Sequence, residues 1–366
     1  MSIDCLVVGG CGFLGYHLVA NLLRDPDIQR IYILDRNISL NTHKGPTYLQ
    51  GNITNQVDLA LLISKLRPTV IFHAASPIAA LPTHRQPEFA ATNIHGTAHL
   101  LSIAKATPSV KALVYTSSAD VYTDPPHEDV VETHALWPET DYSNEYNRTK
   151  AIADGLVRAA NGGKLRTACL RLVHAYGDRQ LQGMVEMLDA CKGSGPLFQV
   201  GDGKNLMEVV SGENVAIAHV LTAKALLRES EVEGAGEVSG QAFNISDGQP
   251  VPFWHHTRVI WKTARGQDEL KNLWRVPAWV MVAIVICLEW VLWLGTRDRF
   301  KPPISLSRAS MEYCVYNHTY KIDKARKLLG FEPVANHDEV LAEATRRAVA
   351  GRNAENVDQY EKEKQL

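Results

Sequence analysis

Apolar positions in the first half of the chain follow two alternating periods. Short β-branched runs occur at 3–9 (IDCLVVG), 30–35 (RIYILD), 69–75 (TVIFHAA) and 111–118 (KALVYTSS). Between them, apolar residues recur with helical spacing at 13–24 (FLGYHLVANLLR), 58–67 (DLALLISKLR) and 95–106 (HGTAHLLSIAKA). Strands that alternate with helices in this way predict a parallel sheet covered on both faces by helices.

The second half of the chain is less regular. A helix is predicted to begin near Ser143, and LRTACLRLV (165–173) predicts another strand. Six of the seven tryptophans then lie between Trp254 and Trp293. The pattern predicts an α/β protein with a doubly wound, Rossmann-type domain over 1–173 and a smaller C-terminal lobe over 174–350, which we expect to bind an apolar substrate. Some segments of this lobe are expected to return to the Rossmann core, and the polar residues 351–366 to form a solvated tail.

One apolar run interrupts the lobe at 276–295 (VPAWVMVAIVICLEWVLWLG). Its stretch from Ala278 to Leu294 would rise about 25 Å as a helix, slightly short of a bilayer core of roughly 30 Å. The segment KIDKARKLLGFEPV (321–334) looks like part of the same globular fold as residues 1–250, so both ends of the run should lie on one side of a membrane. We therefore expect a helix that dips into the membrane interface, while a protein-covered helix and a full span stay open. Basic residues flank the run and favour an anionic lipid surface: Lys271, Arg275, Arg297, Arg299 and Lys301.

Charge and cysteine content narrow the function classes. The net charge is −2, with basic residues scattered, which excludes the basic stripe of a nucleic-acid-binding protein. The six cysteines contain no CxxC pair, as expected for reduced thiols, and no metal site is predicted. The first strand begins at residue 3 and leaves no room for a signal peptide. We expect the cytoplasm, or the cytosolic face of the endoplasmic reticulum or another internal membrane.

A glycine-rich turn follows the first strand directly. Gly9, Gly12 and Gly15 in GGCGFLG open the first helix, where backbone can approach a pyrophosphate at a helix N-terminus. Asp35 ends the second strand 20 residues after Gly15, the distance at which a carboxylate reaches the adenosine ribose. This acid favours NAD, because it would repel a 2′-phosphate. Arg36 keeps NADP open, because a guanidinium could pair with that phosphate.

Candidate catalytic groups lie in YNRTK and at the end of the fourth apolar run. Tyr146 and Lys150 are four residues apart in a helix pattern and therefore share one face. A neighbouring ammonium would favour the phenolate and lower the tyrosine pKa. Ser118 ends a strand 28 residues before Tyr146, at the carboxyl edge of the sheet where ligands bind. The Tyr-x-x-x-Lys spacing alone is a weak signal, because chance often supplies it; a second tyrosine, Tyr142, also lies nearby.

These motifs carry a family resemblance over nearly the whole chain. GGCGFLG, YTSSADVY and YNRTK, in this order, resemble the extended short-chain dehydrogenases/reductases. The segments 200–219 (VGDGKNLMEVVSGENVAIAH), 243–254 (FNISDGQPVPFW) and 321–334 look like the 3β-hydroxysteroid dehydrogenase family, and most closely its sterol-4α-carboxylate 3-dehydrogenase branch. The phrase at 243–254 is the most specific, because sugar-nucleotide epimerases do not share it.

The resemblance implies a role for each matching residue. Tyr146 would be the catalytic acid/base, Lys150 would hold the nicotinamide ribose and tune Tyr146, and Ser118 would hydrogen-bond the reacting oxygen. Asn93 matches a family asparagine near the active site, although a helix-start role fits it equally well. Further cofactor contacts are expected from Phe13, Leu14, Asn52, Ile53, Ala74, Ala75 and Ser76. The sequence departs from the family pattern at Val8, Asn52 and Leu172, which affects cofactor affinity and pocket shape more than chemistry.

The implied reaction is NAD(P)-dependent oxidation of a 3β-hydroxyl to a 3-ketone on a sterol, triterpenoid or related lipid-like molecule. A 4-carboxyl group could then leave as carbon dioxide. Oxidation or ketone reduction of a meroterpenoid without decarboxylation uses the same groups. A sugar-nucleotide epimerase and a non-catalytic NAD-binding regulator stay as alternatives, and a homodimer stays open. His255 and His256 are interpreted as structural or surface residues.

Overall fold

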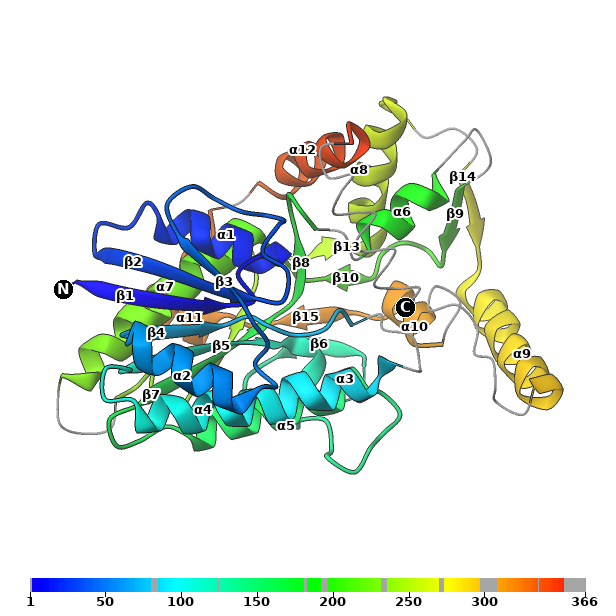
Figure 1. The fold of residues 1–366 in the computed structure, drawn as a ribbon. Helices are drawn as coiled ribbons and strands as arrows, with labels where there is room; N and C mark the ends of the chain where they lie inside the picture. The colour runs from blue at the N-terminus through cyan, green and yellow to red at the C-terminus, as the bar shows by residue number, and fades with distance from the viewer. Residues whose placement is uncertain are drawn as a thin grey trace.

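The computed structural model describes residues 2–79, 85–123, 125–180, 183–191, 197–231, 236–269, 273–296, 308–334 and 336–351. The tail from residue 352 lies outside these ranges, as do the flanking basic residues Lys271, Arg297, Arg299 and Lys301. Figure 1 shows a sheet layered between helices, with a second group of elements beyond its carboxyl edge.

The central sheet has seven strands, and every neighbouring pair is parallel. Their order across the sheet is β12 (Ala242–Ile245), β7 (Arg166–Leu172), β5 (Ala112–Ser118), β4 (Val70–His73), β1 (Ile3–Val8), β2 (Ile28–Asp35) and β3 (Thr47–Gln50). The chain moves outward in one direction from β1 to β3 and in the other from β4 onward. This reversal confirms the predicted doubly wound fold and places the ligand-binding crevice between β1 and β4.

Helices cover both faces of the sheet (Figure 1). On one face lie α1 (Phe13–Leu22), α7 (Gly212–Ser230) and α11 (Asp323–Leu329), packed into one apolar core with the strands. On the other lie α2 (Gln56–Leu66), α4 (Thr97–Ala106) and α5 (Glu145–Ala159). The short helix α3 (Pro87–Phe89) and a π-helical stretch at Ala90–Gly96 lead into α4. Elements as late as α11 therefore return to the Rossmann half.

The lobe joins small sheets to further helices. One sheet runs β13 (Val251–Pro252), β10 (Leu206–Met207), β15 (His318–Tyr320) and β6 (His127–Val130), so a strand from the first half of the chain lies in the lobe. The lobe also contains two separate two-stranded sheets. One pairs β8 (His174–Tyr176) with β11 (Val209–Ser211), and the other pairs β9 (Leu197–Val200) with β14 (Leu273–Val276). The remaining helices are α6 (Met184–Ala190), α8 (Phe253–Arg265), α9 (Ala278–Thr296), α10 (Arg308–Val315) and α12 (His337–Val349).

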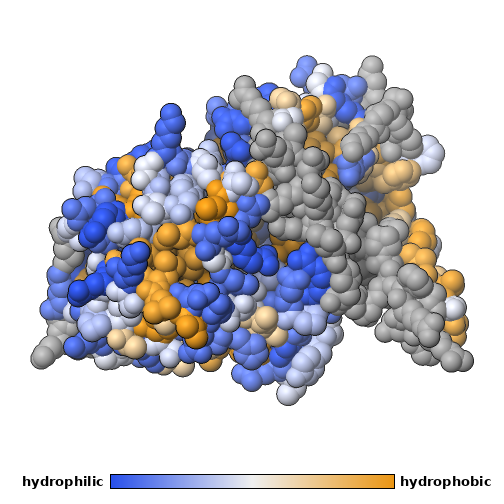
Figure 2. Space-filling view, viewed as in Figure 1, coloured by the Kyte–Doolittle hydropathy of each residue, from blue (hydrophilic) through white to orange (hydrophobic). Residues whose placement is uncertain are grey.

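The apolar run forms α9, which projects away from the lobe (Figure 1). Val285 is buried, and Ala278 and Met281 pack against the lobe core, but Trp279 and Trp290 are 74% and 60% exposed. Figure 2 shows hydrophobic residues along this helix. Among the described residues, no helix meets the length and hydropathy needed to cross a membrane.

A buried ion pair ties α5 to the sheet. Arg171 on β7 donates to both carboxylate oxygens of Asp154 on α5, at 2.8 and 3.0 Å, and both side chains are buried. Ser117 on β5 donates to the same carboxylate at 2.9 Å, and Arg171 also donates to the Tyr122 hydroxyl at 3.1 Å. Burial alone would raise the Asp154 pKa, but the bonds from Arg171 lower it overall. Helix and strands are thus joined at one charged point.

Replacing Arg171 by methionine should lower the free energy of unfolding by about 3 kcal/mol, because it removes the buried cation of Asp154 and leaves only the partly exposed Arg158 to pair with it. Urea denaturation followed by circular dichroism measures the change. Arg24→Met is the matched control: its partner Glu213 lies 3.9 Å away and both side chains are exposed, so the loss should stay below about 1 kcal/mol. Equal losses in the two variants would contradict the assigned role of the buried pair.

Candidate active site

The glycine-rich turn packs too closely for any side chain at two positions. Gly9 has a φ of +84°, and a Cβ there would lie 2.6 Å from the backbone nitrogen of Ala75, which follows β4. A Cβ at Gly15 would lie 2.3 Å from the Gly9 carbonyl oxygen. Gly12 is different, because a Cβ there would meet only the Gly9 carbonyl oxygen at 3.4 Å. It caps the N-terminus of α1, where backbone N–H groups are available to an anion.

Asp35 and Arg36 lie at the end of β2, beside this turn. The Asp35 carboxylate accepts a hydrogen bond from the Cys11 backbone N–H at 2.9 Å, and burial raises its pKa. The Arg36 guanidinium lies 3.7 Å from the carboxylate of Glu88. Glu88 also accepts two hydrogen bonds from Arg85, so Arg36 is a more distant partner of this carboxylate. The Asp35 carboxylate favours a ribose with free hydroxyls over a 2′-phosphate.

A cleft of about 300 Å³ opens over the turn. Most of the predicted cofactor residues line it: Gly9, Gly12, Phe13, Asp35, Arg36, Asn52, Ile53, Ala74, Ala75 and Ser76. Leu14 does not line the cleft, because it packs against the apolar core beneath α1. Gly15 is buried under the turn and shapes the cleft indirectly.

Other residues of the cleft were not predicted. Asn37, Leu40 and Asn41 come from the loop after β2, and Arg179 and Gln180 follow β8. The Asn41 side chain donates to the Cys11 carbonyl at 3.0 Å, which holds this loop over the glycine turn. The loop could have been expected from its place after Asp35. Nothing in the sequence indicated that Arg179 reaches the cleft, because the contact depends on the packing of the lobe.

The catalytic candidates meet where β5 ends and α5 begins. The Asn144 side chain caps α5 by accepting from the Asn147 backbone N–H at 3.1 Å. This start places Tyr146 in the first turn, beside Phe89 and within hydrogen-bonding reach of Ser118. Tyr142 precedes the helix, is 71% exposed and stacks under Arg148. The structure therefore separates the two tyrosines and brings Tyr146 to Ser118.

Lys150 is buried one turn further along α5. Its ammonium donates to the Thr116 carbonyl oxygen at 2.6 Å and lies 4.3 Å from the centre of the Tyr115 ring. Burial lowers its pKa to about 7, against the opposing effects of Asp154 and other nearby groups. A lysine that titrates near neutral pH is typical of a catalytic site.

The expected effect of Lys150 on the Tyr146 pKa was wrong for this arrangement. Burial raises the Tyr146 pKa, and the nearby charge of Asp120 raises it further, whereas the hydrogen bond with Ser118 lowers it. Desolvation of the phenolate outweighs the favourable contacts, because the ammonium is directed to the Thr116 carbonyl.

Asp120 is a site residue that the sequence analysis missed. It accepts a hydrogen bond from the Ser118 hydroxyl at 3.0 Å. Its low-dielectric surroundings raise its pKa, although the residue keeps access to solvent. It lies two residues after Ser118 in YTSSADVY, and this proximity was the available signal.

Asn93 lies in the π-helical stretch against α5. Its side-chain nitrogen donates to the Thr149 hydroxyl at 3.1 Å, and its Oδ1 is buried with no hydrogen-bond partner among the described residues. The structure thus places it beside the helix of Tyr146 and Lys150, and not on the wall of the cleft. A buried, unsatisfied acceptor fits a group that donates a hydrogen bond when bound.

The glycine cradle, the acid at the end of β2 and the continuous cleft together fit a dinucleotide. A Cβ at Gly9 or Gly15 would close the space that the turn leaves, and the helix N-terminus supplies donors for phosphate. The catalytic candidates Ser118, Tyr146 and Lys150 do not line this cleft; they lie on β5, which neighbours β4, and on α5.

The tryptophans of the lobe fall into two groups. Trp254 and Trp261 are buried in the lobe core with Phe253 and Leu197. Trp274, Trp279 and Trp290 are exposed instead. The lobe is therefore built around two of them, and the others lie on its outer elements.

Comparison with known proteins gives a consistent family. Residues 6–277 match the profile of the 3-beta hydroxysteroid dehydrogenase/isomerase family. A decarboxylating sterol-4-alpha-carboxylate 3-dehydrogenase of Candida albicans is 33% identical over 90% of this chain and 92% of its own length. The Saccharomyces cerevisiae protein of the same description is 30% identical over 90% and 93%. The Mus musculus protein is 26% identical over 92% and 88%.

Solved structures support the fold. A dTDP-glucose 4,6-dehydratase of Streptomyces venezuelae, solved with NAD, superposes with a TM-score of 0.70 at 20% identity, covering 96% of this chain and 98% of that one. A UDP-glucose 4-epimerase of Thermotoga maritima gives 0.68 at 20% identity, covering 95% and 100%. These likenesses show a common architecture, and the profile match narrows it: the chain belongs to the 3-beta hydroxysteroid dehydrogenase/isomerase family.

Proposed function

We propose that this protein oxidises the 3β-hydroxyl of a 4-carboxysterol or closely related terpenoid to the 3-ketone, with NAD as acceptor and loss of the carboxyl group as carbon dioxide. Two observations support this proposal: Ser118, Tyr146 and Lys150 come together at the end of β5 and the start of α5, and a cleft that fits a dinucleotide lies over the glycine turn. The similarity to decarboxylating sterol-4-alpha-carboxylate 3-dehydrogenases supports the substrate class.

Each group has a role in the proton transfer. Ser118 donates a hydrogen bond to the substrate oxygen and orients it toward Tyr146, which accepts the hydroxyl proton as general base. Lys150 supplies positive charge beside the phenol when it turns from the Thr116 carbonyl toward the ribose that it is proposed to hold. Asp120 holds the Ser118 hydroxyl in place between turnovers.

NAD would be held by the turn at Gly9 and Gly12, by Asp35 at the ribose, and by Asn52 and Ala75 along the cleft. When bound, it supplies the acceptor for the carbinol hydride. The 3-ketone that forms beside a 4-carboxylate is a β-keto acid, and its carbonyl accepts the electron pair released as carbon dioxide leaves. Decarboxylation therefore needs no additional catalytic group from the chain.

Tyr146→Phe should lower kcat by about 10²–10⁴-fold, because it removes the proton acceptor and leaves the ring in place. The measurement is NADH fluorescence of purified protein with a 4-carboxy-3β-hydroxysterol, together with release of carbon dioxide. Tyr142→Phe is the matched control, and its exposed ring predicts unchanged turnover.

Substrate comparison separates the alternatives. A 4-methylsterol that is oxidised as fast as the 4-carboxysterol would contradict the decarboxylating function and favour simple 3β-alcohol oxidation or ketone reduction of a meroterpenoid. Turnover of a UDP-sugar would favour an epimerase. Full activity of Tyr146→Phe, or cofactor binding without turnover of any 3β-alcohol, would contradict the proposed catalytic role.

Asp35→Ala should raise the KM for NAD by about 10- to 100-fold, because a hydrogen bond to a charged group is worth about 1.5–3 kcal/mol. The KM for NADP should fall relative to the KM for NAD, since the variant lacks the charge that repels a 2′-phosphate. Arg36→Ala should change the KM for NAD little, because Arg36 faces Glu88. Initial-rate kinetics with both cofactors measure the ratio, and an unchanged NAD preference in Asp35→Ala would contradict the assignment.

We also propose that α9 makes peripheral contact with the cytosolic face of an internal membrane such as the endoplasmic reticulum. The helix exposes the large apolar side chains of Trp279, Ile284, Trp290, Val291 and Leu294, and exposed apolar surface gathered in this way is typical of membrane or protein contacts. Arg275, just before it, is exposed and suits an anionic headgroup. A membrane contact at this helix suits an enzyme whose substrate is dissolved in lipid.

Trp279→Ser should weaken binding to anionic phosphatidylserine vesicles about tenfold, since burial of a large apolar side chain contributes about 1.5–3 kcal/mol. Co-sedimentation measures the partition. Leu61→Ser on α2 is the matched control, because Leu61 is similarly exposed on the opposite part of the molecule. Alkaline carbonate should release the bound protein from membranes, whereas retention in the pellet would indicate a full span.

A further inference from the structure

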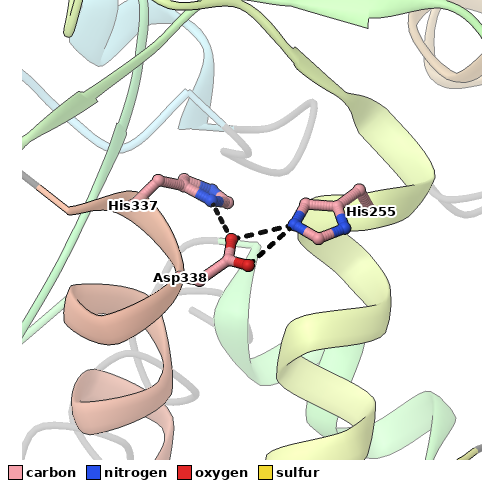
Figure 3. Close-up of side chains that lie close together, drawn as sticks. All are labelled: His255, His337 and Asp338. Carbon is pink, nitrogen blue, oxygen red and sulfur yellow. Dashed lines mark hydrogen bonds and ion pairs between the residues drawn. The ribbon is translucent and has the colours of Figure 1, made fainter.

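Two helix starts bring three potential metal ligands together in the lobe. His255 lies in the first turn of α8, and His337 and Asp338 begin α12. The Nε2 of His255 lies 2.8 and 3.0 Å from the two carboxylate oxygens of Asp338, and the Nδ1 of His337 lies 2.7 Å from one of them. Figure 3 shows both imidazoles directed at the carboxylate between them. The ligand atoms of all three residues lie within 4.8 Å of one another.

This set of atoms suits a borderline divalent metal. Two imidazole nitrogens and one carboxylate oxygen are a recurrent three-ligand set of zinc sites, with water in the fourth position. Zinc holds such ligands at about 2.0–2.2 Å, so neighbouring donor atoms lie about 3.3 Å apart in a tetrahedron. The His255 and His337 nitrogens lie 2.8 and 2.7 Å from one Asp338 oxygen, so each needs to move from that oxygen by only about 0.5 Å to admit the ion. His255 and Asp338 are about half exposed, which leaves a path for the ion and its water.

A neighbouring histidine orients one of the ligands. The Nδ1 of His256 lies 2.9 Å from the Nε2 of His337, on the side of the ring opposite Asp338. At this distance the Nδ1 of a neutral His256 can accept the Nε2–H of His337. His337 is then left with a lone pair on Nδ1, the form that ligates a metal. Ligating histidines almost always donate their second N–H in this manner.

No local sequence motif predicts this cluster of side chains. His255 and Asp338 are 83 residues apart, whereas the expectation of no metal site came from the spacing of cysteines along the sequence. Packing of α8 against α12 in the lobe core brings the ligands together. We propose that His255, His337 and Asp338 bind one Zn²⁺ ion, which clamps the C-terminal helix α12 to α8. This proposal is independent of the proposed dehydrogenase activity.

The test is calorimetric titration of the full chain, first freed of metal with EDTA, with ZnCl₂. One ion should bind per chain at this site, and His255→Gln and Asp338→Asn should each weaken that binding by at least about tenfold. Both residues are exposed enough to be replaced without disturbing the core, which circular dichroism verifies. His95→Gln and Asp268→Asn are matched controls at exposed positions elsewhere and should bind zinc as the parent does.

A second measurement does not depend on counting ions. Zinc should slow amide hydrogen exchange in α8 and α12 of the parent chain and leave it unchanged in His255→Gln. Cobalt(II) should give the visible absorption of a tetrahedral site, again only while His255 and Asp338 are present. Zinc affinity that is equal in the parent, His255→Gln and Asp338→Asn would overturn the proposal, because the three side chains would then only hydrogen-bond one another.

Discussion

The buried carboxylate of Asp154 is the point on which the geometry of the site depends. Tyr146, Lys150 and Asp154 follow one another at intervals of four along α5, so they share one face of the helix. Arg171 on β7 and Ser117 on β5 hold the last of them, and this fixes the rotation of α5 against the sheet. Burying two charges costs several kcal/mol unless the geometry satisfies both. The bidentate contact does so, and the same rotation presents Tyr146 to Ser118.

Sequence reasoning worked where the chemistry is local. The glycines, Asp35 and the strands between them predicted the cleft because each depends on neighbours within one β-turn-α unit. It failed where a contact joins distant segments. Arg179 reaches the cleft only because the lobe folds back over it, and His255 meets Asp338 only because α8 packs on α12. Leu14 shows a third limit: it stands next to cleft residues in sequence, but the turn of α1 directs it to the core.

The Rossmann half and the lobe use apolar residues differently. In the Rossmann half, both faces of the sheet are covered, so the central strands β1, β4 and β5 are buried throughout, whereas β2 and β3 toward one edge are partly exposed. In the lobe, the core includes Trp254 and Trp261, and α9 contacts it through Val285 and Met281, whereas Trp279 and Trp290 of the same helix are exposed. Helical periodicity could not reveal this, because α9 is apolar all round and gives no preferred face. The structure decides which side of the helix is covered.

Two aspartates near the reacting groups show how surroundings divide their roles. The Asp154 carboxylate pairs with the Arg171 guanidinium, which keeps the Asp154 pKa below its ordinary value. This residue positions α5 against the sheet. Asp120 bonds the Ser118 hydroxyl, has a raised pKa and raises that of Tyr146. A negative charge at Asp120 therefore opposes formation of the phenolate, and a proton on it relieves that opposition. The pKa of Lys150 is lowered to about 7, so a group that binds beside the lysine can change its charge near neutral pH. The proposed base Tyr146 thus lies near two groups whose charges a bound ligand can shift, the solvent-accessible Asp120 and the buried Lys150.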